Sequence, residues 1–244
     1  MKARLDKFLV ERGLVPSRER AQALILAGRV LVNEQKVEKP GAAVAEDAAV
    51  RLLGDDLRYV SRGGLKLEAA LARWEIDLTR RVCADVGAST GGFTDCMLQH
   101  GAAAVLAIDT GYGQIAHKLR VDPRVTLLER TNARKLERQK VTLSVTFCAM
   151  DVSFISATLV LPAVVEAMRA TLTETVVLVK PQFEAGREHV GKGGIVRDPA
   201  AHALAVERVR AAVAQLGGEE IEVIDSPVLG AEGNREFLLR ARWS

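Results

Sequence analysis

Aromatic residues are scarce in this chain, and long apolar runs do not occur. Phe, Trp and Tyr make up 4% of its 244 residues, against a hydrophobic content of 48% that can supply an ordinary core. No stretch of 18 apolar residues exists, and the opening MKARLDKFLVERG mixes charged with apolar residues. The sequence therefore predicts neither a membrane span nor a secretory signal peptide, and it indicates no membrane partner.

Cysteines are too few and too far apart for a disulfide framework or a zinc site. The chain has three, at Cys83, Cys96 and Cys148, and they form no C-x-x-C pair. Its four histidines are scattered as well. We therefore expect reduced, mostly buried thiols, a cytoplasmic location and no bound metal.

Excess positive charge is also missing from the chain as a whole, although not from its first part. The net charge is only +3, so any affinity for nucleic acid must come from a local cluster and not from a global field. Residues 1–39 hold nine Lys and Arg against five Asp and Glu. This local excess is larger than that of the whole chain and predicts a basic module at the front.

The module at residues 1–58 has the pattern of a small α+β domain. Leu5, Phe8 and Leu9 have helical spacing, and Gly13 stands where a left-handed helix end needs a glycine. Ser17 is expected to cap a second helix that Gly28 closes, and RVLVNEQKV predicts two strands joined by a turn at Asn33-Glu34. On pattern alone, a solvated pair of amphipathic helices would explain the same residues.

The order of these residues resembles the alpha-L RNA-binding module, which occurs in a small-subunit ribosomal protein, in pseudouridine synthases and in bacterial tyrosyl-tRNA synthetases. The matching parts are the R-L-D-K-x-L opening, the S-R-x-x-A-x-x-L-I-x-x-G-x-V centre and the V-N hairpin. In that family the second helix and the following loop face RNA. The resemblance therefore implies RNA contacts by Arg18, Arg20 and Arg29, and Arg4 in the opening motif is a fourth candidate.

From residue 80 onward, strands and helices alternate. RVCADVG, AAVLAIDTG, VTFCAMDVS and TVVLVKPQF predict strands, and Asp198-Pro199 predicts the start of a helix that ends before Gly217. Two further strands follow, EIEVIDSPV and REFLLRAR. Such repeats predict a parallel sheet covered by helices on both faces, with functional groups at the carboxyl ends of the strands. We place this α/β domain at residues 65–244, after a linker at 59–64.

The loop after the first of these strands lacks one glycine of the dinucleotide fingerprint. In G-x-G-x-x-G the middle glycine lets a pyrophosphate approach the backbone. Gly87 and Gly92 fit the outer positions, but Ser89 stands in the middle. Read from Asp85 to Gly91, the loop is acid-x-Gly-x-Ser-x-Gly, which resembles the S-adenosylmethionine loop of class I methyltransferases. A tight turn needed only for packing would use the same glycines, but the missing glycine favours the methyl donor over NAD.

Further cofactor contacts are expected around this loop. Asp109 ends the next strand, where an acid can accept hydrogen bonds from a ribose diol in either cofactor class. The resemblance to methyltransferases adds Phe93, Asn132 and Asp151. Together these residues predict a site for S-adenosyl-L-methionine.

Four charged residues near strand or helix ends indicate a particular chemistry. Lys66 lies in a helix before the first strand of the sheet, Asp151 and Lys180 close two strands, and Glu236 opens the last. Each alone would be an ordinary solvated side chain or loop cap. Their order, Lys–Asp–Lys–Glu, resembles the tetrad of ribose 2′-O-methyltransferases of the FtsJ type.

The module and the large domain together resemble the TlyA family over nearly the whole chain, with matches in VSRGGLKLEAAL, DVGASTGGFTDC, MDVSFIS, LVKPQFE and GNREFLL. This resemblance implies a class I, Rossmann-like methyltransferase sheet behind a small RNA-binding domain. It also implies methylation of a ribose 2′-hydroxyl, that of a cytidine, in ribosomal RNA. Because the chain starts at the module and ends soon after its last strand, it is similar to the shorter of two family classes, which implies a large-subunit target.

The resemblance also implies roles for the four charged residues. A ribose hydroxyl is a poor nucleophile until it loses or shares its proton, and a lysine can take that proton only if its pKa falls. We assign this role to Lys180, with Lys66 as the neighbouring cation and with Asp151 and Glu236 orienting the ammonium groups. This chemistry requires no metal.

Three other functions compete with this hypothesis. An RNA-binding assembly factor with an inactive fold is disfavoured by the intact tetrad, and a nicotinamide-dependent oxidoreductase is disfavoured by Ser89. A membrane-active haemolysin, which the family's older name implies, is disfavoured because apolar segments such as ISATLVLPAVV are too short to span a bilayer. The expected partner is ribosomal RNA or a ribosomal subunit, with no obligatory protein partner.

Overall fold

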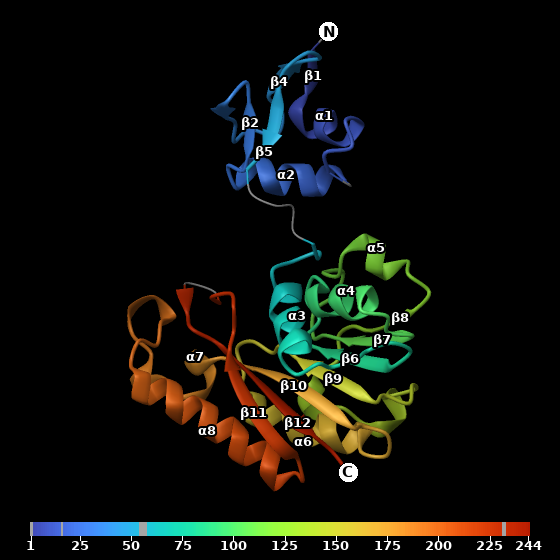
Figure 1. The fold of residues 1–244 in the computed structure, drawn as a ribbon, viewed down its shortest axis with the longest axis vertical. Coiled ribbons are helices and arrows are strands. Elements are labelled where there is room, and N and C mark those ends of the chain that lie inside the picture. Colours follow the sequence, from blue (N-terminus) through green and yellow to red (C-terminus); the bar gives the residue numbers. More distant parts are fainter. Residues whose placement is uncertain (1, 16, 54–57, 231–232) are drawn as a thin grey trace. The chain divides into compact units, whose positions relative to one another are not determined.

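The computed structural model describes residues 2–15, 17–53, 58–230 and 233–244. The chain separates into two compact units, Met1–Arg58 and Tyr59–Ser244. Figure 1 draws both, and each is described by itself. Residues 54–57, at the end of the predicted module, lie outside the described residues.

The first unit packs two helices against short strands. Its elements are β1 (Lys2–Arg4), α1 (Leu5–Glu11), α2 (Arg18–Leu26), β2 (Val30–Val32), β3 (Gln35–Lys36), β4 (Ala43–Ala45) and β5 (Val50–Leu52). Strand β1 pairs antiparallel with β4, and β2 lies between β3 and β5. Leu5, Leu9 and Ile25 of the two helices are fully buried in one apolar cluster with Val30 of β2. This small core is the reason the helical spacing was visible in the sequence.

Several local predictions for this unit are confirmed. The Ser17 side chain accepts a hydrogen bond from the Arg20 amide and so caps α2. Gly13 and Gly28 have φ values of +66° and +64°, and the turn between β2 and β3 is left-handed at Asn33 and Glu34. Strands β1 and β4 were not predicted, because three residues are too few for an alternating pattern to show.

The second unit is built on a seven-stranded sheet of order β11-β12-β10-β9-β6-β7-β8. Its strands are β6 (Val82–Val86), β7 (Ala104–Ile108), β8 (Val125–Leu128), β9 (Phe147–Met150), β10 (Glu174–Val179), β11 (Glu219–Asp225) and β12 (Phe237–Arg242). Five neighbouring strands run parallel as predicted, namely β10, β9, β6, β7 and β8. Strand β12 is antiparallel to both β10 and β11. The prediction of an all-parallel sheet was therefore wrong at β12. A strand that follows β11 without a crossover helix returns in the opposite direction.

Helices cover both faces of this sheet, as the strand–helix repeats predicted. They are α3 (Gly63–Arg73), α4 (Gly92–Gln99), α5 (His117–Arg120), α6 (Ala157–Met168), α7 (Pro181–Glu184) and α8 (Pro199–Gln215), with short 3-10 turns at Ala133–Lys135, Arg138–Lys140, Arg187–His189 and Lys192–Gly194. Apolar residues of α3 and α4 form one core cluster, and those of α6 and α8 form a second. Successive residues of one strand join opposite clusters, as Val105 and Leu106 of β7 show.

Three elements of the second unit were not predicted, apart from its 3-10 turns. Helix α7 begins at Pro181, inside the predicted strand TVVLVKPQF, because proline cannot donate to the strand ladder. Helix α6 is apolar nearly all round and carries Pro162 in its interior, so its sequence has neither an amphipathic pattern nor a proline-free run. Strand β8 is half-buried along its length and lacks a sharp alternation. Within the described part of the chain, none of the helices combines the length and apolar character that a membrane crossing requires.

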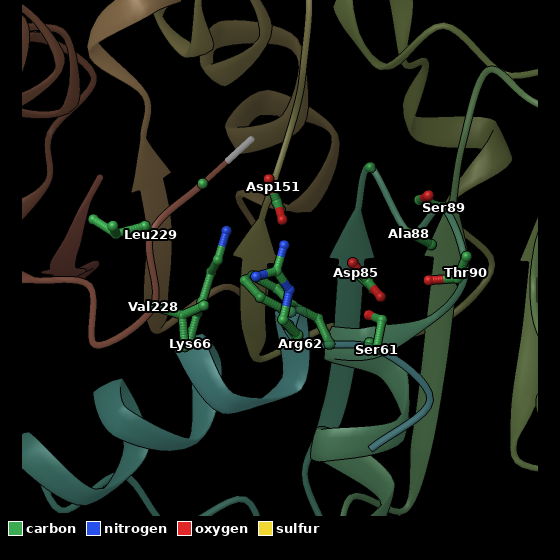
Figure 2. A pocket seen from close by; sticks show the side chains of 15 residues that line it. Ser61, Arg62, Lys66, Asp85, Ala88, Ser89, Thr90, Asp151, Val228 and Leu229 are labelled. Atoms are coloured by element: carbon green, nitrogen blue, oxygen red, sulfur yellow. The ribbon is translucent and has the colours of Figure 1, made fainter. Parts of the chain in front are cut away.

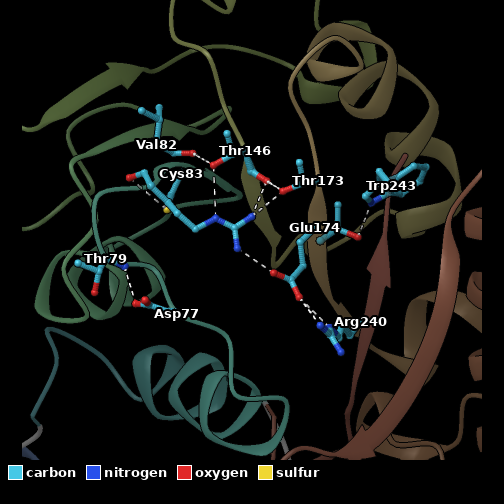
Figure 3. Close-up of polar contacts among 11 residues, drawn as sticks. Asp77, Thr79, Val82, Cys83, Thr146, Thr173, Glu174, Arg240 and Trp243 are labelled. Carbon is cyan, nitrogen blue, oxygen red and sulfur yellow. Dashed lines mark hydrogen bonds and ion pairs between the residues drawn. The ribbon is translucent and has the colours of Figure 1, made fainter.

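The amino ends of the strands are joined by a buried network around Arg81 (Figure 3). Arg81 donates to the Glu174 carboxylate at 2.8 Å and to the Thr146 carbonyl at 2.7 Å, which connects β6, β9 and β10. The other carboxylate oxygen of Glu174 accepts from Arg240 of β12 at 2.7 Å. Because a half-paired buried charge is costly, this network holds the four strands in register at the edge opposite the predicted site.

Candidate active site

The loop of residues 87–91 joins β6 to α4 at the carboxyl edge of the sheet (Figure 2). Gly87 has a φ of +88°, and a Cβ there would lie 2.3 Å from the carbonyl oxygen of Asp151. Gly91 has a φ of +93° at the start of α4, and a Cβ there would lie 2.3 Å from a methyl group of Leu119. Close backbone and side-chain packing therefore accounts for both glycines.

Two cavities open beside this loop and share Gly87, Ser89 and Asp151 as walls. The larger has a volume of about 560 Å³ and extends to the carboxyl ends of β7 and β9. The smaller has a volume of about 250 Å³ and extends toward α3. Of the predicted cofactor residues, Asp109 and Asn132 line the larger cavity, and the smaller one is lined by Asp85, Gly92 and Phe93.

Asp109 lines the larger cavity and also holds the backbone of the loops around it. Its two carboxylate oxygens accept from the amides of Ser89, at 2.8 Å, and Gly111, at 2.6 Å. Asn132 accepts a hydrogen bond from the Arg134 amide at 3.0 Å. Both side chains are therefore oriented by the protein and still present oxygen acceptors to the cavity.

Asp85 is a buried carboxyl group with one oxygen unused by the protein. Its Oδ2 accepts from the amide of Thr94 at 2.9 Å and from the hydroxyl of Thr94 at 2.6 Å. Among the described residues, its Oδ1 has no hydrogen-bond partner, although Asp85 lines the smaller cavity. Burial raises the pKa of Asp85 to about 7. The unused Oδ1 can accept from a hydrogen-bond donor or a cation in that cavity.

The raised pKa of Asp85 predicts a pH-dependent stability. The folded state holds its proton to about pH 7 while the unfolded chain loses it near pH 4, so the free energy of unfolding falls as pH rises between these values. Between about pH 5 and pH 8, wild type should lose about 2–3 kcal/mol more than Asp85→Asn, which cannot ionise. Urea unfolding at both pH values measures this difference. Parallel losses in the two proteins would contradict the raised pKa.

The four charged residues of the predicted tetrad come from four elements and form two ion pairs. Lys66 Nζ of α3 lies 2.6 Å from Glu236 Oε2, just before β12, and both side chains are buried. Lys180 Nζ, at the end of β10, lies 2.6 Å from Asp151 Oδ1, at the end of β9. Figure 2 shows the side chains of Lys66 and Asp151 in the smaller cavity. The structure thus brings all four to the carboxyl edge of the sheet.

The stretch 59–64 differs from the linker that the sequence predicted. Tyr59 is 2% exposed, and the Val60 amide donates to Asp95 of α4 at 2.8 Å. A Cβ on Gly92 would lie 2.3 Å from the Ser61 hydroxyl oxygen, so this stretch packs directly on the glycine-rich loop. Ser61 and Arg62 consequently line the smaller cavity, as Figure 2 shows. Sequence reasoning missed both, although they stand inside the VSRGGLKLEAAL motif.

Two further residues that sequence reasoning missed follow Asp151 in the MDVSFIS motif. The Ser153 hydroxyl accepts a hydrogen bond from Lys180 Nζ at 2.6 Å. Phe154 is 92% exposed with a φ of +64°, and its ring centroid lies 5.6 Å from that of Phe183. Both residues line the larger cavity. The MDVSFIS motif was the only sign of these residues in the sequence. The strain and exposure of Phe154, which are uncommon outside functional sites, became visible only in the structure.

The four arginines predicted to contact RNA lie in the first unit and differ in their surroundings. Arg4 and Arg18 both pair with the fully buried carboxylate of Asp6 at 3.0 Å, while about half of each arginine side chain stays exposed. The Arg4 guanidinium holds the pKa of Asp6 well below its usual range. Arg29 donates to the carbonyl of Leu53 at 2.8 Å, and Arg20 is half-buried on α2. The fold therefore fixes the position of three of these guanidinium groups.

All three cysteines are buried and unbridged. Burial raises the pKa of Cys83 to about 12 and that of Cys148 further, so these thiols are inert at neutral pH. In the described ranges, His, Cys, Asp and Glu side chains form no group of three or more that could hold a metal ion.

Comparison with known proteins gives two family matches and several full-length relatives. Residues 59–243 match the FtsJ-like methyltransferase family, and residues 3–50 match the S4 domain. The chain is 48% identical over 243 residues to the Bacillus subtilis (strain 168) protein named "Putative rRNA methyltransferase YqxC", covering 99% of this chain and 86% of the relative. It is 46% identical over 242 residues to the Mycobacterium tuberculosis (strain CDC 1551 / Oshkosh) protein named "16S/23S rRNA (cytidine-2'-O)-methyltransferase TlyA", covering 99% and 90%.

A solved structure described as "Putative hemolysin from Streptococcus thermophilus" is similar over the whole chain. It has 42% sequence identity and a TM-score of 0.76, and the alignment covers 100% of this chain and 89% of that one. A structure of an S-adenosylmethionine-dependent methyltransferase from Mesorhizobium loti shares the fold of the larger unit, with 17% identity, a TM-score of 0.51 and coverage of 71% and 96%. The predicted class I methyltransferase fold is thereby confirmed.

Proposed function

The chain belongs to the TlyA family, whose larger domain is an FtsJ-like methyltransferase, and on that premise we propose that it methylates a ribose 2′-hydroxyl of ribosomal RNA. The observation that carries this proposal is the pairing of Lys180 with Asp151 and of Lys66 with Glu236 at one edge of the sheet. Two lysines held by carboxylates beside a cavity can handle the proton of a hydroxyl group. A cytidine is the proposed target, since the name of the Mycobacterium tuberculosis relative specifies it.

The residues around the glycine-rich loop fit S-adenosyl-L-methionine. The unused Oδ1 of buried Asp85 suits the ammonium group of its methionine part. Asp109 and Asn132 offer oxygen acceptors to ribose hydroxyls, and Ile108 and Ile155 give the larger cavity an apolar wall. When bound, this cofactor supplies an electrophilic methyl group on a sulfonium centre. The loop has no middle glycine for a pyrophosphate, because Ser89 occupies that position.

Lys180 is the residue that we assign to the ribose proton. Its side chain follows the end of a strand and is 10% exposed, so bulk water is largely kept away. Its Nζ donates to Ser153, which lines the larger cavity. Asp151 lies 2.6 Å away and favours the charged amine, so Lys180 has to release a proton to water before it can take that of the ribose. Asp151 then stabilises the ammonium group that forms. Lys66, held by Glu236, remains a fixed cation that orients the substrate in the smaller cavity.

The first unit is the proposed RNA-binding domain. It matches the S4 domain, and the arginines on α2 and the loop after it are the candidates for phosphate contacts. We propose that residues 1–58 bind RNA and that the unit from Tyr59 onward is catalytic, with 59–64 serving as part of the cavity wall. A ribosomal substrate would place the protein in the cytoplasm, with a ribosomal subunit as its partner.

A methylation assay tests the proposed function directly. It contains the purified protein, ribosomal subunits and S-adenosyl-L-methionine labelled in the methyl group. We expect label in 23S RNA of the large subunit, and nucleotide mapping should locate it on a cytidine 2′-oxygen. Label on 16S RNA alone would contradict the large-subunit target. Binding of subunits and of the methyl donor without any transfer would instead support the assembly-factor alternative.

Arg18 and Arg20 give a separate prediction for RNA affinity. If both contact phosphates, the Arg18→Ala, Arg20→Ala double variant should lower the slope of log affinity against log salt by about one for each lost contact. The matched control is Arg51→Ala, since Arg51 lies on β5 and pairs with Glu34 at 2.7 Å. Filter binding to ribosomal RNA across a salt series measures the slope. An unchanged slope in the double variant would show that these arginines do not touch phosphate.

A further inference from the structure

The Lys180 amine contacts two neighbours. Asp151 was predicted from the sequence as its partner, whereas Ser153 was not. Nζ lies 2.6 Å from Asp151 Oδ1 and 2.6 Å from Ser153 Oγ. Asp151 closes β9, and Ser153 stands two residues later on the loop that lines the larger cavity. The two contacts therefore come from one short segment of the chain.

An acceptor at a fixed place determines the direction in which a neutral lysine amine presents its lone pair, and Ser153 is such an acceptor for Lys180. Such an amine has two N–H bonds and one lone pair, arranged with the Cε bond as a tetrahedron. Because one N–H donates to Ser153, rotation about Cε–Nζ is restricted. The contact with Asp151 is an ion pair without hydrogen-bond geometry, so it does not fix the direction of a second N–H. With Asp151 alone, the amine can rotate about its remaining bond and the lone pair samples several directions.

We infer that Ser153 is a positioning residue that orients the lone pair of Lys180 toward the ribose hydroxyl. This inference rests on the proposed function. In the step it serves, the 2′-oxygen attacks the methyl carbon, the carbon–sulfur bond breaks, and the hydroxyl proton moves to the Lys180 lone pair. Lys180 becomes an ammonium that pairs with the Asp151 carboxylate and donates to Ser153, and it later releases the proton to water.

The second serine of the same motif shows what a purely structural serine does here. Ser156 accepts from the Thr158 amide at 3.2 Å and lies at hydrogen-bond distance from Glu184, so it caps α6. Ser153 instead is exposed at the cavity, and its hydroxyl accepts a hydrogen bond from Lys180. Of the two serines of MDVSFIS, Ser156 therefore caps a helix and Ser153 contacts the candidate catalytic lysine.

Three variants of the full chain test this inference: Ser153→Ala, Ser153→Thr and Ser144→Ala. Ser144 is an exposed serine in the loop that precedes β9, outside both cavities, and serves as the matched control. For each protein we would measure kcat and KM with ribosomal subunits, calorimetric affinity for S-adenosyl-L-methionine, the melting temperature and the pH dependence of kcat.

Ser153→Ala should lower kcat by about tenfold to a hundredfold, because a misdirected reacting group costs rate and not affinity. KM, cofactor affinity and melting temperature should match those of Ser144→Ala. The midpoint of the kcat–pH curve should move to lower pH, because the lost hydroxyl favoured the charged amine. Ser153→Thr keeps the hydroxyl and should restore both kcat and the midpoint.

Three results would overturn the inference: wild-type kcat in Ser153→Ala, an equal loss in Ser153→Thr, or a loss of kcat with an unmoved midpoint. The first would show that Asp151 alone orients the amine, the second that the hydroxyl is not the relevant group, and the third that Ser153 acts on something other than Lys180. An inactive wild type would overturn the proposed function itself, so the two failures are distinguishable.

Discussion

Replacing Lys180 by Arg or Met will abolish methyl transfer while S-adenosyl-L-methionine and ribosomal RNA still bind. A general base contributes about 10²–10⁴-fold to rate, so turnover should fall at least a hundredfold. Met removes the amine, and Arg fails because a guanidinium stays protonated and has no lone pair to offer. Single-turnover methylation of ribosomal subunits measures the rate, and calorimetry measures the affinity for the cofactor.

The control for this pair is Lys140→Met, because Lys140 is an exposed lysine in a 3-10 turn away from both cavities. It should methylate like wild type. An active Lys180→Arg would show that the position needs only a positive charge. Lys180 would then stabilise charge beside Asp151, and the ribose proton would pass to water.

Gly87→Ala should weaken cofactor binding and slow turnover together. A Cβ at this position would lie 2.3 Å from the Asp151 carbonyl oxygen and 2.9 Å from its carbonyl carbon, so one of the two backbones has to move. Any such shift displaces the loop at the shared wall of both cavities and moves Asp151 away from Lys180. A misplacement of about 1 Å costs about a hundredfold in rate, and we expect a loss of cofactor affinity of similar size.

Gly113→Ala separates this contact from backbone strain. Gly113 has a φ of +71°, similar to the +88° of Gly87, but a Cβ there would meet nothing within 4 Å. It should lose stability, by about 1 kcal/mol, and keep cofactor binding. Calorimetry on both variants gives the comparison. Equal cofactor affinity in the two would show that the Gly87–Asp151 contact does not shape the site.

The local elements of this protein were mostly readable from its sequence. Ser17 and Asp198 cap the helices that they were expected to cap, because a capping residue acts within its own helical turn. The apolar strands that end at Asp85-Val86 and at Lys180 were visible because buried strands are continuous apolar runs. The order of the four charged residues is likewise a property of the chain, and it pointed to the methyltransferase family before any geometry was available.

Pairing between distant segments is what only the tertiary structure decided. The antiparallel direction of β12, the packing of residues 59–64 on the glycine-rich loop and the partners of each lysine all join residues far apart in the sequence. Lys66 and Glu236, for example, are separated by 170 positions. Local patterns report the propensity and burial of a segment, whereas its partners follow from how the whole sheet closes over its core. For that reason the four charged residues could be predicted from the sequence, while the structure showed that they form two ion pairs and that Ser153 lies beside one of them.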